Sequence, residues 1–199
     1  MTQQKNLHAL VALGTTSALA LSAGVANAGA DVYVGLSAGV AGGDIPVPAD
    51  GDIDNYGLSG GVMGVFAGIS TTTANGMMVG AELAWSGNTE GDPNGESSYD
   101  YAYDVLWTLD AKLRVGANLG NVTVYGFGGL STGRAANYWI ADGYTFHGTN
   151  IGVGAEMPVG ENFIVGIEAI SRDVQGYVSS GNDMRSSHQA INLRASFRF

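Results

Sequence analysis

Two short stretches in the second half of the chain carry residue types that could do nucleophilic chemistry. His147-Gly148-Thr149 and Ser186-Ser187-His188 each place a hydroxyl close to an imidazole in sequence, and such a base activates such a nucleophile once the two groups touch. The chain contains 3 histidines, and nothing in their spacing brings these groups together, which is the first requirement for proton transfer. We therefore predict no catalytic residues and keep an acyl hydrolase or transferase as an alternative.

An acidic stretch in the first third of the chain looks like the start of a calcium-binding loop. Asp50-Gly51-Asp52-Ile53-Asp54 has the D-x-D-x-D opening, but Asn55 and Gly61 stand where the loop needs a glycine and a bidentate glutamate. The chain also has no cysteine, which excludes thiolate-based zinc and iron–sulfur sites. We therefore predict no metal site and no cofactor. Loose collection of divalent cations remains an alternative for this stretch and for the acids of 88–104, namely Glu90, Asp92, Glu96, Asp100 and Asp104.

The elements that must position any site are strands, because apolar residues alternate with small or polar ones over long stretches. The pattern is clearest in 32–40, 77–85, 105–117 and 191–199. In 105–117, Val105 and Trp107 belong to the apolar face and Leu106 to the opposite face. Weaker copies of the pattern occur at 57–69, 122–133, 147–158 and 162–174, which brings the predicted number of strands to eight. The glycines of 122–133 leave the facing of that strand unassigned.

The connections between these segments alternate in length. Three are short, at 71–75, 118–121 and 158–162, and four are long, at 42–56, 88–103, 134–146 and 175–187. Strands of about ten residues are long enough to cross a bilayer at a tilt, whereas a membrane helix needs about 18 consecutive apolar residues, which no stretch beyond residue 30 has. The pattern predicts an all-β fold, an eight-stranded antiparallel up-and-down transmembrane β-barrel.

Charged residues fall on the same face of these strands as the glycines. The interior of an eight-stranded barrel is only wide enough to be filled by side chains, so glycines make room there and buried charges must pair. We predict a balanced network of three acids and three bases, Glu82, Asp110, Lys112, Arg114, Glu168 and Arg194. The network is either a structural plug or a gate whose pairs rearrange to open a narrow ion path. Aromatic residues near strand ends would form the interfacial girdles of the outer face, namely Trp85, Trp107, Trp139, Phe163, Phe197 and Phe199.

The N-terminal segment has the composition of an export signal. Lys5 supplies a positive start, Leu7 to Val25 form an apolar stretch, and Ala26-Asn27-Ala28 matches the A-x-A cleavage pattern. We therefore predict a signal peptide at 1–28 and one barrel domain at 29–199.

The charge of the chain limits its partners. The formal net charge is −10, and the 8 basic residues are scattered, whereas nucleic-acid binding needs clustered Lys and Arg. We therefore predict no nucleic-acid partner. Because the acids concentrate in the long connections, any extracellular partner is expected to bind through acidic loops.

Several short motifs resemble those of outer-membrane β-barrel proteins, the family that includes the OmpA-type transmembrane domain and the Opa-like porin-family proteins. The resemblance covers most of the chain after residue 28. Its most recognisable part is the glycine-rich run 56–64 followed by Val79-Gly80-Ala81-Glu82, which is similar to the second and third strands of the family. Three further segments are family-like: 112–116, 125–129 and Ile167-Glu168.

This resemblance implies a location in the outer membrane, with lipid and lipopolysaccharide around the barrel. It implies a structural, surface-interaction or small-solute pore role, and a last strand that the barrel-assembly machinery reads through Ile191, Leu193, Ala195, Phe197 and Phe199. Two alternatives remain open. One is a lipid-modifying enzyme with its catalytic groups at the barrel rim, and the other is a soluble periplasmic lipocalin-like binder whose apolar residues face inward.

Overall fold

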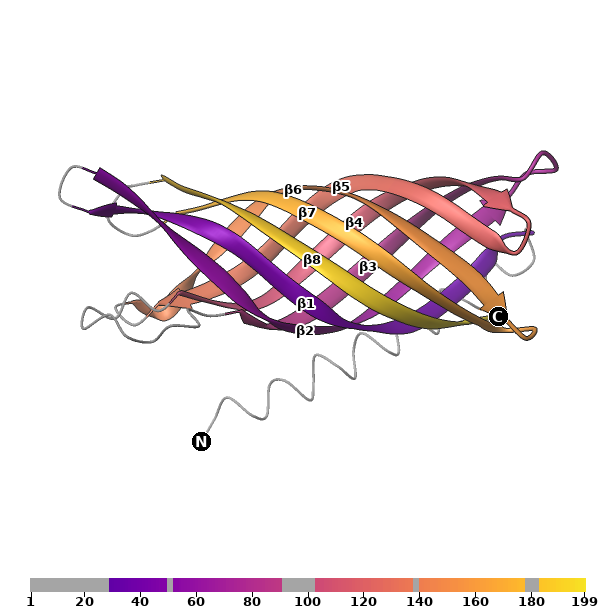
Figure 1. The fold of residues 1–199 in the computed structure, drawn as a ribbon, viewed down its shortest axis with the longest axis horizontal. Helices are drawn as coiled ribbons and strands as arrows, with labels where there is room; N and C mark the ends of the chain where they lie inside the picture. The colour runs from indigo at the N-terminus through magenta and orange to yellow at the C-terminus, as the bar shows by residue number, and fades with distance from the viewer. Residues whose placement is uncertain (1–28, 50–51, 91–102, 138–139, 178–182) are drawn as a thin grey trace, which may run out of the picture.

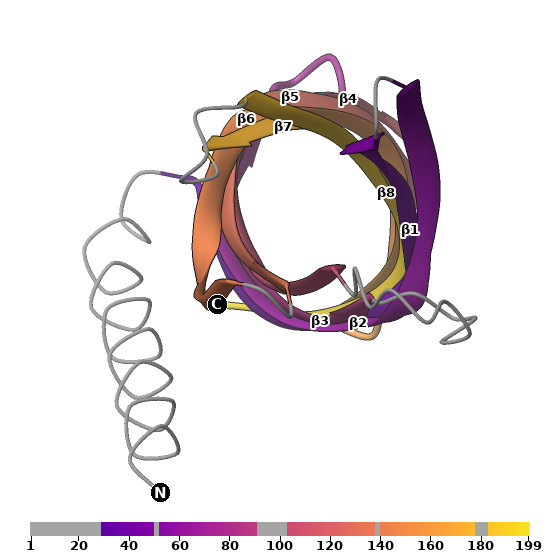
Figure 2. The same ribbon diagram turned by 90° about the vertical axis from the view of Figure 1, so that its left-hand side faces the viewer.

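The computed structural model describes residues 29–49, 52–90, 103–137, 140–177 and 183–199. Its strands are β1 (Asp31–Ala49), β2 (Asp52–Thr72), β3 (Met77–Glu90), β4 (Tyr103–Leu119), β5 (Val122–Asn137), β6 (Ile140–Val159), β7 (Phe163–Tyr177) and β8 (Asp183–Arg198). Each strand pairs antiparallel with the next and β1 pairs with β8, so the sheet closes on itself, as the end-on view of Figure 2 shows. The predicted eight-stranded up-and-down barrel is confirmed. No helix long and apolar enough to cross a membrane occurs in these described residues.

The strands are staggered, as the closure of a tilted barrel requires. A row of paired residues that leaves β1 at Val34 passes through the other strands and returns to β1 at Asp44, ten positions further along. This stagger tilts every strand against the barrel axis, as Figure 1 shows. It brings inward-facing residues of strands that are distant in the sequence to the same height in the lumen.

The strands continue beyond the segments that alternation predicts. β1 runs to Ala49 and β2 already begins at Asp52. Pairing continues in this region because it satisfies the backbone N–H and C=O groups whatever the side chains are. Much of three predicted long connections is therefore strand instead, namely 42–56, 134–146 and 175–187. Of the fourth, 88–103, only 88–90 and residue 103 lie in strands, and 91–102 lie outside the described residues.

Tight turns join the strands at the other end of the barrel. The turns after β2, β4 and β6 each contain a glycine at positive φ, Gly76 (82°), Gly120 (71°) and Gly160 (78°), a conformation in which a side chain is strained. In the first turn, the Thr73 N–H donates to the Met77 carbonyl at 2.8 Å. Short turns mark the periplasmic end of a bacterial outer-membrane barrel, and the C-terminus lies at this end as well (Figure 1).

Side chains alternate across the wall in the central part of the barrel. On β4, Leu113 is 69% exposed, whereas its neighbours Lys112 and Arg114 are 4% and 1% exposed. Large apolar side chains face outward in this way on every strand, which is the arrangement that a bilayer requires. It is also the reverse of the inward-facing apolar side chains of a lipocalin-like barrel.

The facing of β5 explains the need for glycine on its neighbour β6. Tyr125 and Phe127 point into the lumen, at 2% and 5% exposure. A Cβ atom on Gly154 would lie 2.3 Å from the Tyr125 ring, and one on Gly152 would lie 2.2 Å from the Phe127 ring. The lumen can hold these aromatic rings only because glycine stands opposite each of them.

A β-bulge in β4 changes the facing of its first residues. Val105 pairs with Ala135 and Trp107 pairs with Arg134, so Leu106 is an extra residue in β4. As a result Val105 is buried at 2% exposure, whereas Leu106 is 44% exposed. The prediction that Val105 lies on the outer apolar face and Leu106 on the inner face is wrong, because strict alternation leaves no place for an extra residue.

Beyond the bulge, toward the end with long connections, the polarity of the wall is reversed. Outward side chains such as Thr145 and Asp173 are exposed there. A wall that is polar outside and apolar inside suits water, so this end of the barrel stands in solvent rather than in lipid. Its interior is buried and largely apolar, and it is lined by Val105, Ala135, Tyr144, Phe146 and Val174 together with the buried His188.

Aromatic side chains gather near the two edges of the outer apolar band. Trp85 and Trp107 lie on the paired strands β3 and β4 toward the solvent end. At the turn end, Phe197 packs edge to face against Phe163 and Phe199, with ring centroids 5.3 and 5.2 Å apart. These positions are typical of interfacial girdles, whereas Trp139 lies outside the described residues.

Candidate functional site: charged residues in the barrel lumen

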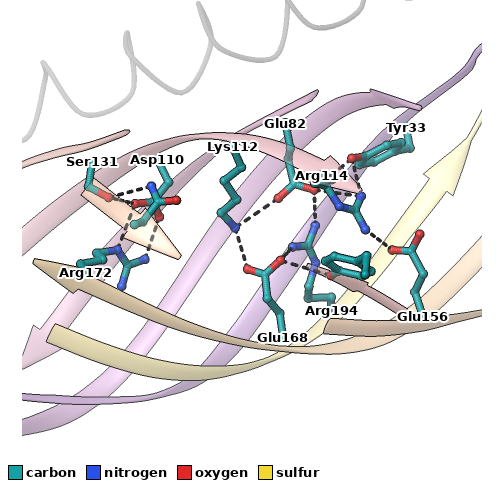
Figure 3. A network of polar contacts seen from close by, with 12 residues as sticks. Tyr33, Glu82, Asp110, Lys112, Arg114, Ser131, Glu156, Glu168, Arg172 and Arg194 are labelled. Carbon is teal, nitrogen blue, oxygen red and sulfur yellow. Dashed lines mark hydrogen bonds and ion pairs between the residues drawn. The ribbon is translucent and has the colours of Figure 1, made fainter. Parts of the chain in front are cut away.

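The charged residues of the lumen form two groups, which Figure 3 shows side by side. The larger group contains Glu82 of β3, Lys112 and Arg114 of β4, Glu168 of β7 and Arg194 of β8. Lys112 and Arg114 are two positions apart on one strand, so both side chains point inward. The stagger of the barrel then brings the residues of β3, β7 and β8 to their height.

Glu82 has the most partners in the larger group. Its Oε1 accepts a hydrogen bond from Lys112 Nζ at 3.3 Å. Its Oε2 accepts hydrogen bonds from Arg194 Nη2 at 2.5 Å, Tyr33 Oη at 3.1 Å and Arg114 Nη1 at 3.4 Å. The Glu82 side chain has 0% exposure, and a carboxylate cut off from water needs charged donors of this kind to remain ionised.

Glu168 is the second fully enclosed carboxylate of this group. It accepts hydrogen bonds from Lys112 Nζ at 2.6 Å and Tyr125 Oη at 3.2 Å, and it also pairs with Arg194. Lys112 and Arg194 therefore each bridge Glu82 and Glu168. The four side chains form a closed ring of ion pairs across the lumen.

The three cations of the larger group also contact aromatic faces. Contacts of this kind stabilise a charge that has lost its water, because the face of a ring is electronegative. Arg114 lies over Tyr125 at 3.8 Å, Arg194 over Phe66 at 3.8 Å, and Lys112 over Phe127 at 4.8 Å.

Asp110 belongs to the second, smaller group. It accepts two hydrogen bonds from Arg172, from Nε at 3.0 Å and from Nη2 at 2.7 Å, and a third from Ser131 Oγ at 2.6 Å. Asn150 Nδ2 in turn donates to Ser131 Oγ at 2.9 Å. The sequence predicts Asp110 in one network with five other residues, but its ion pair in the structure is with Arg172.

Sequence reasoning misses two charged residues of the lumen, Glu156 and Arg172. Glu156 Oε2 accepts a hydrogen bond from Arg114 Nη2 at 2.7 Å. The spacing along the strands could have identified both residues as inward-facing. Arg172 follows the inward-facing Glu168 by four positions on β7, and Glu156 lies an even number of positions from Asn150 on β6. With both included, the described part of the chain places equal numbers of acids and bases in the lumen. They are Glu82, Asp110, Glu156 and Glu168 with Lys112, Arg114, Arg172 and Arg194.

The two histidines after residue 28 lie on opposite sides of the wall. His147 and Thr149 are exposed on the outer face of β6, whereas His188 is 3% exposed on the inner face of β8. Ser186 Oγ and His188 Nε2 are 3.1 Å apart, and the His188 ring stacks on Phe146 with centroids 5.9 Å apart. Ser186 and His188 are thus in contact, but the two predicted stretches do not combine into one site.

The acidic stretch near β2 is only partly described. Asp52, Ile53 and Asp54 lie in β2, while Asp50 and Gly51 lie outside the described residues. Most of the acidic region 88–104 lies outside them as well. Within the described ranges, no three His, Asp or Glu side chains are grouped so that they could hold a metal ion.

A cavity of about 160 Å³ opens at the turn end of the lumen. Glu156 lines it, and the Glu156 side chain is 21% exposed, whereas its partner Arg114 is 1% exposed. Water in the cavity therefore reaches Glu156 but not the guanidinium behind it. Other polar residues that line the cavity include Asp31, Tyr33, Thr123, Ser196 and Arg198.

Several solved structures are similar to the chain at low sequence identity. The chain is similar to the solved structure of Ail, the attachment invasion locus protein of Yersinia pestis, with 17% identity, a TM-score of 0.45 and coverage of 84% of this chain and 99% of that one. It is similar to Neisserial surface protein A, with 16% identity, a TM-score of 0.49 and coverage of 82% and 95%. It is also similar to OprG from Pseudomonas aeruginosa, with 13% identity, a TM-score of 0.46 and coverage of 86% and 96%.

No protein with a curated description matches the chain. A family model does match, that of the outer membrane protein β-barrel domain, and it covers residues 9–199. This match spans nearly the whole chain and confirms the resemblance seen in the sequence motifs. The chain therefore belongs to the family of outer membrane proteins with this β-barrel domain.

Proposed function

We propose that this protein is a sealed, non-conducting barrel of the outer membrane, with a structural role and a solvent-exposed end that interacts with partners. The filling of the lumen carries the proposal. Glu82, Lys112 and Arg194 reach toward one another from three strands, and their side chains are 6% exposed or less. A hydrated ion entering the lumen would have to separate these ion pairs.

The energy of the ion pairs supports closure. Removal of one partner from a buried ion pair destabilises a protein by about 3–5 kcal/mol, because the remaining charge is left uncompensated. Separation of a pair inside the lumen has a similar consequence, since water cannot replace the lost partner. A penalty of about 4 kcal/mol corresponds to an open fraction on the order of one in a thousand.

The distribution of charge supports an interactive role for the solvent-exposed end. Four acids and four bases cancel within the lumen, so the formal charge of −10 comes from residues outside it. Exposed acids toward the solvent end include Asp44, Asp104 and Asp173. Such a surface repels polyanions and attracts basic partners, or divalent cations that bridge it to lipopolysaccharide.

We also propose the export route that the sequence indicates. The signal peptide at 1–28 would be cleaved, and the barrel-assembly machinery would read the apolar residues of β8. The geometry of the C-terminus supports this assignment, because the Phe199 N–H donates to the Val32 carbonyl at 3.0 Å while the Phe199 side chain remains 48% exposed.

Recordings in planar lipid bilayers test the sealed barrel. We expect the purified wild-type protein to give no current steps at moderate voltage, because the ion pairs of the larger group stay closed. Insertion of folded protein is checked separately by the change in gel mobility on boiling. Reproducible current steps from the folded wild-type barrel would show that the lumen conducts and would overturn the proposal.

A second candidate function is a narrow ion path that opens when the pairs rearrange. The sharing of Glu82 by three cations favours it, since one cation can leave while two remain. Glu82→Ala and Arg114→Ala remove partners from this group, and each should produce current steps if rearrangement opens a path. Silence in both folded variants would end this candidate and leave the sealed barrel standing.

A further inference from the structure

Glu156 differs from the other charged lumen residues in its contact with solvent. Its side chain is 21% exposed, whereas the other charged side chains of the two groups are between 0% and 6% exposed. It lines the cavity at the turn end, which is the periplasmic end of the barrel. Glu156 is therefore the carboxylate at the boundary between periplasmic water and the sealed part of the lumen.

Arg114 lies directly behind this boundary. Its Nη2 donates to Glu156 at 2.7 Å, while its Nη1 donates to Tyr33 Oη at 2.5 Å and lies 3.4 Å from Glu82. The Nε of Arg114 is buried without a hydrogen-bond partner among the described residues. Glu156 is thus the nearer of the two carboxylates that Arg114 contacts.

Glu156 joins the larger group through its ion pair with Arg114, and the charge of that group depends on it. With it, three carboxylates face three cations. Without it, Glu82 and Glu168 must compensate Lys112, Arg114 and Arg194, and the group carries one excess positive charge. In a site closed to water, an uncompensated cation draws in an anion or moves toward solvent.

We propose that Glu156 is a lock at the periplasmic end of the lumen: it holds Arg114 across the lumen, and loss of its negative charge lets small anions such as chloride enter from the cavity. The proposal rests on the proposed closure of the lumen by ion pairs. It adds that anions are the ions that enter and that they enter from the periplasmic side, neither of which follows from the closure alone.

The chain contains no cysteine, so a single substitution provides a switchable test. Glu156→Cys is purified as a folded barrel and recorded in planar bilayers with chloride and potassium gradients. Methanethiosulfonate reagents are then added on the periplasmic side. The thiolate attacks the reagent sulfur, a mixed disulfide forms and methanesulfinate leaves, so the side chain gains either a sulfonate or a trimethylammonium group.

We expect Glu156→Cys to conduct with a preference for chloride over potassium. The sulfonate reagent restores a negative charge and should abolish the current, whereas the trimethylammonium reagent should leave the current or increase it. Glu161→Cys is the matched control, because Glu161 is an exposed acid of the neighbouring periplasmic turn. It should stay silent with either reagent.

Two outcomes contradict the proposal, and they differ from failure of the sealed barrel. The proposed role of Glu156 is contradicted if folded Glu156→Cys gives no current in any modified state, or if its current prefers potassium. In either case the wild-type barrel remains sealed. Current through the wild type overturns the sealed barrel itself. If Glu156→Cys does not fold, the isosteric Glu156→Gln replaces it, and its permeability ratio decides in the same way.

Discussion

Asp110 and Asp173 each pair with an arginine, but the first pair is buried and the second is exposed to solvent. Each accepts two hydrogen bonds from one arginine, Arg172 inside the lumen and Arg185 on the outer surface beyond the apolar band. The inner pair is 1% and 4% exposed, whereas the outer pair is 53% and 76% exposed. Water replaces a lost partner only at the outer site, so the same substitution should have different consequences at the two positions.

We predict that Asp110→Asn destabilises the barrel by about 3–5 kcal/mol, because Arg172 keeps its charge and loses its carboxylate. The measurement is the free energy of unfolding by urea in lipid vesicles, followed by tryptophan fluorescence. A loss that is too small to measure would contradict the assignment of Asp110 and Arg172 as a sealed ion pair.

Asp173→Asn is the matched control, and we predict no measurable change in unfolding free energy at neutral pH. The hydrogen bonds from Arg185 hold the pKa of Asp173 below its usual value. A lowered pKa in the folded state gives a small stabilisation that is present above the unfolded pKa and is lost as pH falls through the folded pKa. A pH titration should therefore show at most a small excess stability of wild type over Asp173→Asn at neutral pH, and this excess should vanish in acid. Equal losses from Asp110→Asn and Asp173→Asn would contradict the contrast.

At the scale of the strand, glycine has different roles on the two faces of β5. A Cβ atom on the inward-facing Gly129 would lie 1.8 Å from the Ala111 carbonyl oxygen, so no side chain fits. A Cβ atom on the outward-facing Gly128 would have its nearest contact at 3.8 Å, with the Asn150 carbonyl oxygen. The close approach of the β4 backbone therefore requires glycine at position 129, whereas position 128 has room for a side chain.

We predict that Gly129→Ala prevents closure of the barrel or strongly lowers its stability. Gly128→Ala should be neutral or stabilising by about 0.5–1 kcal/mol, since alanine loses less backbone freedom than glycine in a strand. Gel mobility before and after boiling reports closure, and urea unfolding reports stability. Equal tolerance of the two substitutions would show that the close approach of the β4 backbone does not explain the glycine at position 129.

Alternation was sufficient to predict the eight strands, the short turns and the outward face of the barrel, because a bilayer imposes strict polarity on each position it covers. It failed at Val105, where a bulge shifts the phase, and in the long connections, where water imposes no such pattern. Six inward charges could be predicted from parity, but their partners could not. Asp110 pairs with Arg172 rather than with the other five predicted residues, because the stagger of the closed sheet decides which inward side chains lie at the same height in the lumen. No local sequence pattern encodes that stagger.

At the scale of the whole molecule, the proposed assembly signal at the C-terminus lies where the barrel closes. Phe199 extends the aromatic cluster of Phe163 and Phe197 on the outer face, and its backbone bonds to β1 where the barrel closes. Deletion of one exposed terminal residue removes little buried surface, so it should change the stability of the closed barrel only slightly. Recognition by the assembly machinery would instead depend on it directly.

We predict that deletion of Phe199 lowers the amount of folded protein in the outer membrane of cells, while the same variant refolds in detergent with nearly the wild-type yield. Substitution of Phe163, which is also exposed (58%), by leucine serves as the control for a general loss of aromatic surface. Equal losses in cells and in detergent would mean that Phe199 acts through barrel stability rather than through assembly.

The sealed lumen is tested most directly by hydrogen exchange of the arginine side chains in the folded barrel. Nitrogen-15-labelled protein in lipid bilayers is transferred to D₂O, and the side-chain N–H signals of Arg114, Arg194 and Arg185 are followed by NMR. We predict that the signals of the buried Arg114 and Arg194 persist, while those of Arg185, which is 76% exposed, disappear at once. Loss of all three at the same rate would mean that water fills the lumen, and it would contradict the sealed barrel.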